Sequence, residues 1–123
     1  MALYLKNLGK KGRGVFTDKL IRKGEVIETC PVIPLSKEEI KIIRKTRLVH
    51  YWYSWSKDLR TGQCIVMGWG MIYNHSCKPN ADFKSDMKNK NIIYFAIKDI
   101  LPGEEITDDY GVRLWFKEHD ENK

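Results

Sequence analysis

The sequence predicts a mainly β fold built from several small sheets, with little helix. Five short β-rich runs are each bounded by Gly, Pro or Asn, and only one stretch carries the cap and the spacing of a helix. The 123 residues, of which 42% are hydrophobic, are enough for one modest core. We therefore expect a single domain over residues 1–123.

The predicted strands follow one another along the chain with turn residues between them. Each run combines β-branched or aromatic side chains with a turn-forming residue at its edge. The runs are Gly14–Thr17, Val26–Cys30, Cys64–Met67, Asn91–Ile97 and Glu105–Tyr110. Residues 86–91 are rich in Asn and Asp, which tolerate left-handed backbone, so this segment predicts a hairpin turn.

One helix is expected to begin after Ser36, because Ser36 and Glu39 fit a capping box. Ile40 and Ile43 provide a partial apolar face, and the helix should be short. Residues 49–55 then alternate in character, which predicts an extended segment that packs on both faces.

Two segments of similar sequence, IRKGEVI from Ile21 and ILPGEEI from Ile100, each place a Gly-Glu turn before a strand. This similarity indicates two alike corners of one β fold. It is too short to predict an internal repeat.

Composition restricts the class of protein. No stretch approaches the roughly 20 apolar residues that span a bilayer, and charge interrupts the first residues before a signal-peptide core can form. We expect a soluble, intracellular protein with no membrane partner.

The cysteines Cys30, Cys64 and Cys77 include no CxxC pair, which predicts reduced thiols. The net charge of +6 favours an acidic partner such as a nucleic acid, although Lys and Arg occur in short groups that are typical of solvated faces.

Three segments are candidates for a functional site. In the first, Gly12 and Gly14 flank Arg13 before a strand, which indicates either a ligand loop or a plain tight turn. The second, from Gly68 to Asn80, gathers short polar side chains that bind a ligand or tie down a buried bend. It contains His75 and Cys77 but no full tetrahedral set, so no metal site is predicted. The third ends at Tyr110, which is either a catalytic hydroxyl or part of a solvated strand end.

Together these segments resemble the signature motifs of SET-domain methyltransferases, in the same order. The matching stretches are GRG at 12–14, NHSCKPN at 74–80 and GEEITDDYG at 103–111. The chain is similar in length to short viral and bacterial members that lack pre-SET and post-SET segments. The resemblance implies a β-clip-like SET-domain fold with a knot-like threaded C-terminal segment, signature motifs over 12–111 and a closing segment at 112–123. Threading of this kind is rare.

The resemblance also implies an enzyme, a protein-lysine N-methyltransferase that uses S-adenosylmethionine. The implied cofactor-binding residues are Gly12, Arg13, Gly14, Tyr73, Asn74, His75, Tyr110 and Trp115. Tyr110 would be the catalytic tyrosine that orients the amine, and Tyr51 a second tyrosine of the lysine channel, with Trp69 and Tyr73 as weaker candidates. A free lysine has a pKa near 10.4, so only about one in 2,500 is neutral at pH 7. A narrow apolar channel would favour that neutral, attacking form.

Three features differ from larger members of the family. No cysteine follows Cys77, so a zinc-binding segment over the active site is not expected, and residues 114–116 become the candidates that close the channel. Asp108 stands where many relatives carry a Tyr or Phe that governs the number of methyl groups added, so product specificity is not readable. Three roles stay open for the Asp108 carboxylate: to bind a water, to bind the lysine amine, or to point outward. Met71 replaces an Arg of many relatives.

The implied substrate is a protein with an exposed lysine, and a histone tail is one candidate. A histone substrate would place the protein in the nucleus on chromatin, and another substrate in the cytoplasm. A cationic tail would be repelled by the +6 chain unless acidic residues form a local groove; the available ones are Asp82, Asp86, Glu104, Glu105, Asp108 and Asp109.

Two other functions stay open alongside the enzyme. One is a non-catalytic SET-like binding module. The other is a small basic nucleic-acid-binding protein in which Trp52, Tyr53 and Trp55 stack on bases. The enzyme itself requires no direct contact with nucleic acid, and a homodimer is left open.

Overall fold

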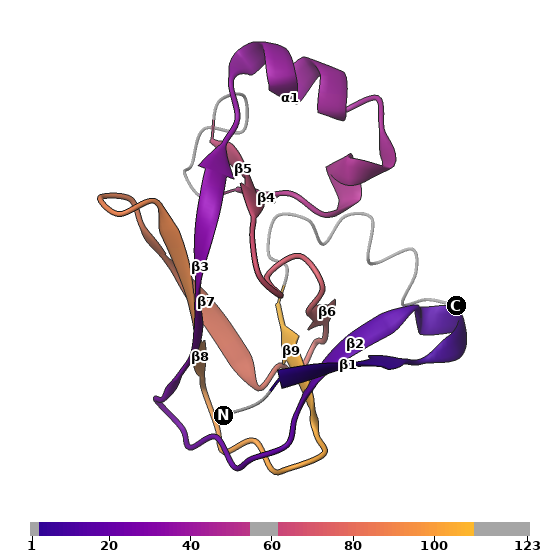
Figure 1. Ribbon diagram of the computed structural model, residues 1–123, viewed down its shortest axis with the longest axis vertical. Helices are drawn as coiled ribbons and strands as arrows, with labels where there is room; N and C mark the ends of the chain where they lie inside the picture. Colours follow the sequence, from indigo (N-terminus) through magenta and orange to yellow (C-terminus); the bar gives the residue numbers. More distant parts are fainter. Residues whose placement is uncertain (1–2, 55–61, 110–123) are drawn as a thin grey trace.

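The computed structural model describes residues 3–54 and 62–109 (Figure 1). Within these ranges the chain forms two antiparallel-rich sheets, one α-helix and two short 3-10 helices. The four-stranded sheet has the order β1 (Leu3–Asn7), β2 (Arg13–Thr17), β9 (Glu105–Asp108), β6 (Asn74–His75). The five-stranded sheet has the order β4 (Tyr53–Ser54), β5 (Gln63–Val66), β3 (Val26–Pro34), β8 (Asn91–Ala96), β7 (Ala81–Asp86). The predicted mainly β fold of small sheets is confirmed.

Both sheets contribute to one main core. Strand β8 shows the period of two that a half-buried strand requires, because Ile92, Tyr94 and Ala96 are buried while the residues between them are partly exposed. Val15 of β2 and Ile106 of β9 belong to the same cluster from the other sheet. The core therefore fixes the position of β2 and β9 relative to the larger sheet.

The helix α1 (Lys37–Ile43) begins as predicted, with the capping box of Ser36 and Glu39. The Glu39 amide donates to Ser36 Oγ at 3.1 Å, and the Ser36 amide donates to Glu39 Oε1 at 2.8 Å. The hydrogen bond from the Ser36 backbone, followed by that from the Ser36 side chain, lowers the pKa of the Glu39 carboxyl. Ile40 anchors the helix in a second, smaller core cluster. No helix in the described part of the chain is long and apolar enough to span a bilayer.

The extended segment predicted for residues 49–55 is wrong in its first part. A 3-10 helix, η2 (Arg47–His50), forms there because Thr46 caps it, its Oγ1 accepting from the Leu48 amide at 3.2 Å. Only β4 is extended, and residue 55 lies outside the described residues. Trp52 is buried in the second core cluster and cannot stack on a nucleic-acid base.

The hairpin predicted at residues 86–91 is confirmed between β7 and β8. Asp86 accepts hydrogen bonds from the Asn89 amide at 3.3 Å and from Asn89 Nδ2 at 2.9 Å. The left-handed residue is Lys90, with φ of 56°, rather than an Asn or Asp. Asp86 and Asn89 are of the residue types expected to adopt left-handed backbone here, but they hold the turn by side-chain hydrogen bonds instead.

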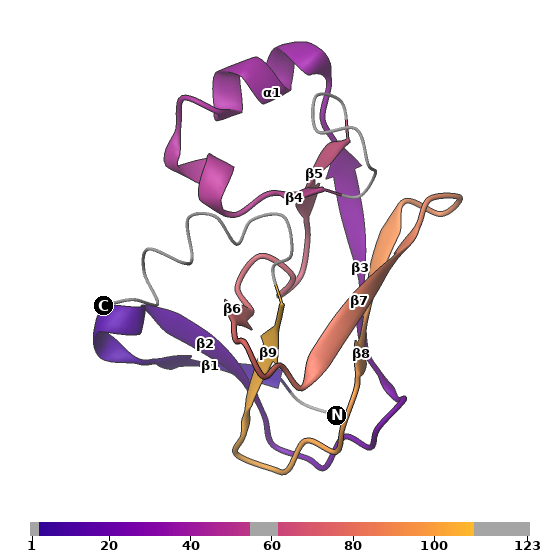
Figure 2. The same ribbon diagram turned by 180° about the vertical axis from the view of Figure 1, so that it is seen from behind.

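The two corners of similar sequence face each other across an antiparallel bridge between Ile21 and Ile100. In each corner a glycine adopts positive φ, 90° at Gly24 and 87° at Gly103. The glutamate that follows each glycine accepts a hydrogen bond from the backbone amide three residues earlier in the chain. Figures 1 and 2 both show these corners at the end of the molecule opposite α1.

Candidate functional site

The three sequence motifs meet around β9. Strand β9 pairs antiparallel with β2 on one side and parallel with β6 on the other. In the parallel pair, Asn74 lies opposite Thr107 and His75 opposite Asp108. The Ser76 amide extends the contact by donating to the Asp108 carbonyl at 3.0 Å. Segments about 30 to 90 residues apart along the chain are thus brought into one small region.

Asn74 links all three motifs through its side-chain amide. Its Nδ2 donates to the Arg13 carbonyl at 3.1 Å and to Glu105 Oε2 at 2.7 Å. Because both contacted atoms are hydrogen-bond acceptors, the atom of the Asn74 amide that faces them must be the nitrogen, and Oδ1 is the acceptor on its other side. The Asn74 side chain is therefore held in one orientation by the protein itself.

Asn80 forms a second link, to the backbone of β9. Its Nδ2 donates to the Glu105 carbonyl at 2.8 Å, and its Oδ1 accepts from the Thr107 amide at 2.9 Å. The residue is 7% exposed, so these bonds replace water on two strand groups that would otherwise be buried unpaired. We call Asn74, Asn80 and Glu105 the clamp. The polar side chains of the NHSCKPN segment thus tie down a bend, which the sequence had left open as one of two interpretations.

The glycines of the GRG motif serve two different purposes. Gly12, with φ of 81°, closes a tight turn in which its amide donates to the Gly9 carbonyl and its carbonyl accepts from the Leu8 amide. Gly14 instead leaves room for the clamp, because a Cβ there would lie 2.5 Å from Glu105 Oε2 and 2.8 Å from Leu8 Cδ1. The group that lies closest to Gly14 is thus a carboxylate of the chain itself.

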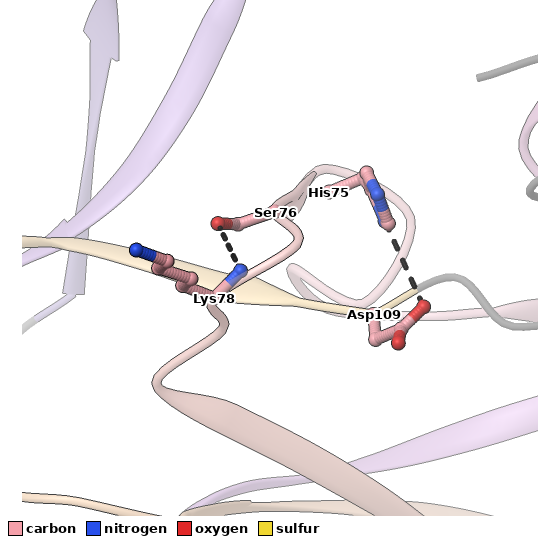
Figure 3. A network of polar contacts seen from close by, with 4 residues as sticks. All are labelled: His75, Ser76, Lys78 and Asp109. Carbon is pink, nitrogen blue, oxygen red and sulfur yellow. Dashed lines mark hydrogen bonds and ion pairs between the residues drawn. The ribbon is translucent and has the colours of Figure 1, made fainter. Parts of the chain in front are cut away.

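His75 lies beside the residue that precedes Tyr110. Its side chain is 3% exposed, and Nδ1 lies 3.9 Å from Oδ1 of Asp109, whose side chain is 57% exposed (Figure 3). At this distance the contact is an ion pair when the imidazole is protonated, rather than a hydrogen bond. Next to it, Ser76 Oγ accepts from the Lys78 amide at 3.0 Å. The bend after β6 is therefore ordered by its own short polar side chains.

Asp108 is fully buried on β9, so the interpretation that it points outward is wrong. It also cannot contribute to an acidic surface groove. Of the other acidic residues considered for that groove, Asp86 and Glu104 accept hydrogen bonds within their own turns. Several predicted residues lie outside the described residues, namely Tyr110 and Trp115, residues 114 and 116, and with them the closing segment and the threaded crossing.

Tyr73 lies in the main core, 1% exposed, with its ring centroid 4.7 Å from that of Tyr94. Its hydroxyl donates to Glu28 Oε1 at 2.5 Å, and the Trp69 amide donates to the same oxygen at 3.2 Å. Tyr51 is 43% exposed and follows η2. The structure therefore brings Gly12, Arg13, Gly14, Asn74 and His75 into one region, with the Tyr73 side chain turned into the core.

Sequence reasoning missed Glu28, a carboxylate on β3 that holds the segment leading to β6. Its only signal in the sequence is an acidic residue inside an otherwise apolar strand run. Glu28 also acts on Cys30: burial first, and then the neighbouring carboxylate, raise the pKa of the Cys30 thiol far above its ordinary value.

The burial of the thiols predicts which cysteines react with an alkylating reagent. Native protein treated with iodoacetamide near pH 8 should be labelled at Cys77, which is exposed, while Cys30 and Cys64, which are buried, should stay protected. Mass spectrometry of tryptic peptides would then show a single labelled site, and three after denaturation in urea. Rapid labelling of Cys30 in native protein would contradict the burial described above.

The described cysteines are all thiols, and no group of three or more His, Cys, Asp or Glu side chains comes together among residues 3–54 and 62–109 in a way that would hold a metal ion.

Comparisons with known proteins agree with the resemblance that the motifs carry. The SET domain family matches residues 12–111 of this chain. The H3 lysine-37 specific histone-lysine N-methyltransferase of Schizosaccharomyces pombe is 36% identical over 117 residues, 94% of this chain and 78% of the relative. Histone-lysine N-methyltransferase Set2 of Drosophila melanogaster is 34% identical over 108 residues, 82% of this chain but 5% of that protein. The structure of the Neurospora SET domain protein DIM-5, a histone lysine methyltransferase, matches with a TM-score of 0.67 at 25% identity, covering 88% of this chain and 51% of that one.

Proposed function

Because this chain belongs to the SET-domain family of protein-lysine N-methyltransferases, we propose that it transfers a methyl group from S-adenosylmethionine to the side-chain amine of a lysine in a protein. The observation that supports this most directly is the clamp. It draws the GRG turn, the NHS segment and the strand that leads to Tyr110 into one region. Each of these segments carries a motif of the family.

The residues around the clamp suit the charges of S-adenosylmethionine. When bound, this cofactor supplies a methyl group on a cationic sulfonium, beside an amino-acid end that carries an ammonium and a carboxylate. Asn74 Oδ1 and the Glu105 carboxylate are acceptors that favour the cationic groups, and the exposed Arg13 guanidinium favours the carboxylate. We propose that Gly12, Arg13, Gly14, Asn74 and His75 hold the cofactor, with Tyr110 and Trp115 completing the site. Tyr73, whose side chain is in the core, would support the site by anchoring the segment before Asn74.

Tyr110 is the proposed catalytic residue. In the sequence it follows Asp109 directly, and the Asp109 carboxylate lies beside His75. In the proposal its hydroxyl orients the neutral lysine amine in line with the methyl group, and the gain in rate comes mainly from alignment and exclusion of water. Tyr51 is proposed to line the lysine channel and the segment after Tyr110 to close it.

The proposed substrate is a histone, because two relatives that match more than four fifths of this chain are named for histone lysines. A histone substrate would place the protein on chromatin. Core histones are therefore the first substrates to test, with mass spectrometry identifying the lysine and the number of methyl groups.

The test compares wild type with Tyr110→Phe and with a control, Tyr4→Phe. Tyr4 is a 40% exposed tyrosine whose ring stacks on Phe16, a contact that Phe preserves. Isothermal titration should show S-adenosylmethionine binding by all three proteins within about threefold, since the hydroxyl serves the transition state more than the ground state. Transfer of labelled methyl groups to histones should be about 100-fold slower or worse for Tyr110→Phe alone, in the range expected for loss of a group that acts on the reacting amine.

Three results would contradict the proposal in different ways. If titration with S-adenosylmethionine gives no binding heat, the methyltransferase proposal fails and the nucleic-acid-binding alternative is favoured. Binding without transfer by wild type to any histone or to other basic proteins would favour the non-catalytic binding module. Equal loss of transfer in Tyr4→Phe would remove the specific role of Tyr110.

A further inference from the structure

Residues 37–47, which cover α1, the turn after it and the first residue of η2, form one of the basic segments of the chain. Residues 37–47 contain five Lys or Arg against two Glu, an excess of three that equals half of the net charge of +6. All five basic side chains are exposed. They are Lys37, Lys41, Arg44, Lys45 and Arg47. A second basic segment, residues 6–13, has four Lys or Arg and no acid.

Lys37 and Lys41 lie four residues apart on α1, which places them on the same side of the helix. Arg44 and Lys45 follow in the turn that closes α1, three and four residues after Lys41. Ile40 and Ile43 are turned instead toward the second core cluster. The Glu39 carboxylate accepts from the Ser36 amide at the helix start, whereas Glu38 is exposed three residues before Lys41, at the edge of the basic side chains. We call the four basic residues Lys37, Lys41, Arg44 and Lys45 the basic flank.

We propose that the basic flank binds the phosphate backbone of a nucleic acid without reading its sequence. The flank is about 10–12 Å long at 1.5 Å per residue, and duplex DNA presents one phosphate charge per 1.7 Å of axis, so about three or four phosphates lie within reach of these flexible side chains. Charge complementarity selects this partner. Of the three aromatic residues that would stack on bases, Trp52 is nearest in sequence to the basic flank, and it is buried. Contact with the phosphate backbone of the nucleic acid, rather than with its bases, is therefore expected.

The basic flank is separate from the candidate site. Figures 1 and 2 both show α1 at one end of the molecule, with β6 and β9 well below it. A nucleic acid on the flank would therefore leave the cofactor region open. It would also offset the repulsion between the +6 chain and a cationic substrate. Of the statements made for the basic flank, only this one rests on the proposed function.

The test uses two double variants that lose the same charge. Lys41→Gln/Lys45→Gln removes two charges from the flank, and Lys84→Gln/Lys88→Gln removes two exposed charges from β7 and the β7–β8 turn. Glutamine keeps helix propensity close to that of lysine. Binding to fluorescein-labelled 20-bp duplexes of two unrelated sequences is followed by fluorescence anisotropy between about 50 and 200 mM KCl, the range over which phosphate contacts lose affinity steeply.

Wild type should bind both duplexes within about twofold, with a slope of log K against log salt near −3 for about three phosphate contacts. The flank variant should bind at least about tenfold more weakly at 100 mM KCl with a slope reduced by nearly 2, while the control variant should change by less than about threefold. Both variants should melt like wild type and bind S-adenosylmethionine unchanged. A failed cofactor titration therefore concerns the proposed function alone.

Equal weakening by the two variants would overturn the proposal, because affinity would then follow net charge rather than the flank. Absence of anisotropy change at about 100 μM protein and 50 mM KCl would also overturn it, since non-specific DNA binding is usually at least that tight. Binding to phosphatidylserine vesicles that depends on the same two lysines, without binding to either duplex, would assign the flank to a membrane surface instead.

Discussion

Replacement of Asn80 by alanine should lower the free energy of unfolding by about 2–5 kcal/mol, because it leaves two groups of β9 unpaired at about 1–3 kcal/mol each. Those groups are the Glu105 carbonyl and the Thr107 amide, both bonded to a side chain that is 7% exposed. The same loss should loosen β9 beside β6. Urea denaturation followed by circular dichroism measures the stability, and titration with S-adenosylmethionine measures the site.

The matched control is Asn89→Ala in the β7–β8 turn. Asn89 also bonds through its amide, to Asp86, but it is exposed. Water can replace that bond, so the cost should stay below about 1 kcal/mol and cofactor binding should not change. If Asn80→Ala unfolded at the same urea concentration as Asn89→Ala, the clamp would not be what holds β9.

Substitution of Gly14 by alanine should weaken S-adenosylmethionine binding at least tenfold. The new Cβ would stand 2.5 Å from Glu105 Oε2, so the carboxylate must move and give up its 2.7 Å bond from Asn74. Gly14 is not among the positive-φ glycines, so backbone strain does not contribute. The atoms met are the ends of the flexible Glu105 and Leu8 side chains, so the cost in stability should stay near the low end of overpacking, about 1 kcal/mol. Titration calorimetry gives the affinity and thermal melting gives the stability.

Gly9→Ala separates the two effects. Nothing lies within 4 Å of a Cβ at Gly9, but its φ of 69° strains any residue with a side chain. This variant should lose about 1 kcal/mol of stability through that strain while keeping cofactor affinity within about threefold. Equal affinity losses in Gly9→Ala and Gly14→Ala would mean that cofactor binding follows general stability rather than the position of the Glu105 carboxylate.

Local chemistry accounts for the parts of the fold that were predicted correctly. The capping box at Ser36 and Glu39, the strand runs at β2 and β8, and the turn after Asp86 each depend on residues close together in the chain. The predictions that failed also have local causes. The Thr46 cap folds residues 47–50 into η2, although the alternation of side chains from residue 49 is typical of a strand.

Strands β1, β6 and β7 were not predicted because their own sequences carry little β pattern. β7 is largely polar, as an edge strand can be, and is defined by pairing with β8. β6 has only two residues and exists because β9 lies beside it. Of the three, only β6 depends on a partner that is distant in sequence, whereas β1 and β7 each pair with the next strand along the chain.

By itself, the sequence determined the mainly β class, the family and the residue types of the site, because three motifs keep their order and their chemistry along the chain. Only the tertiary structure decided what those residues touch. The close approach at Gly14 is made by Glu105, Asp108 is buried, and the Tyr73 hydroxyl points to Glu28 rather than into a channel. The reason is physical: a buried polar group must find its partner wherever the packed chain brings one, and separation along the sequence does not say where that is.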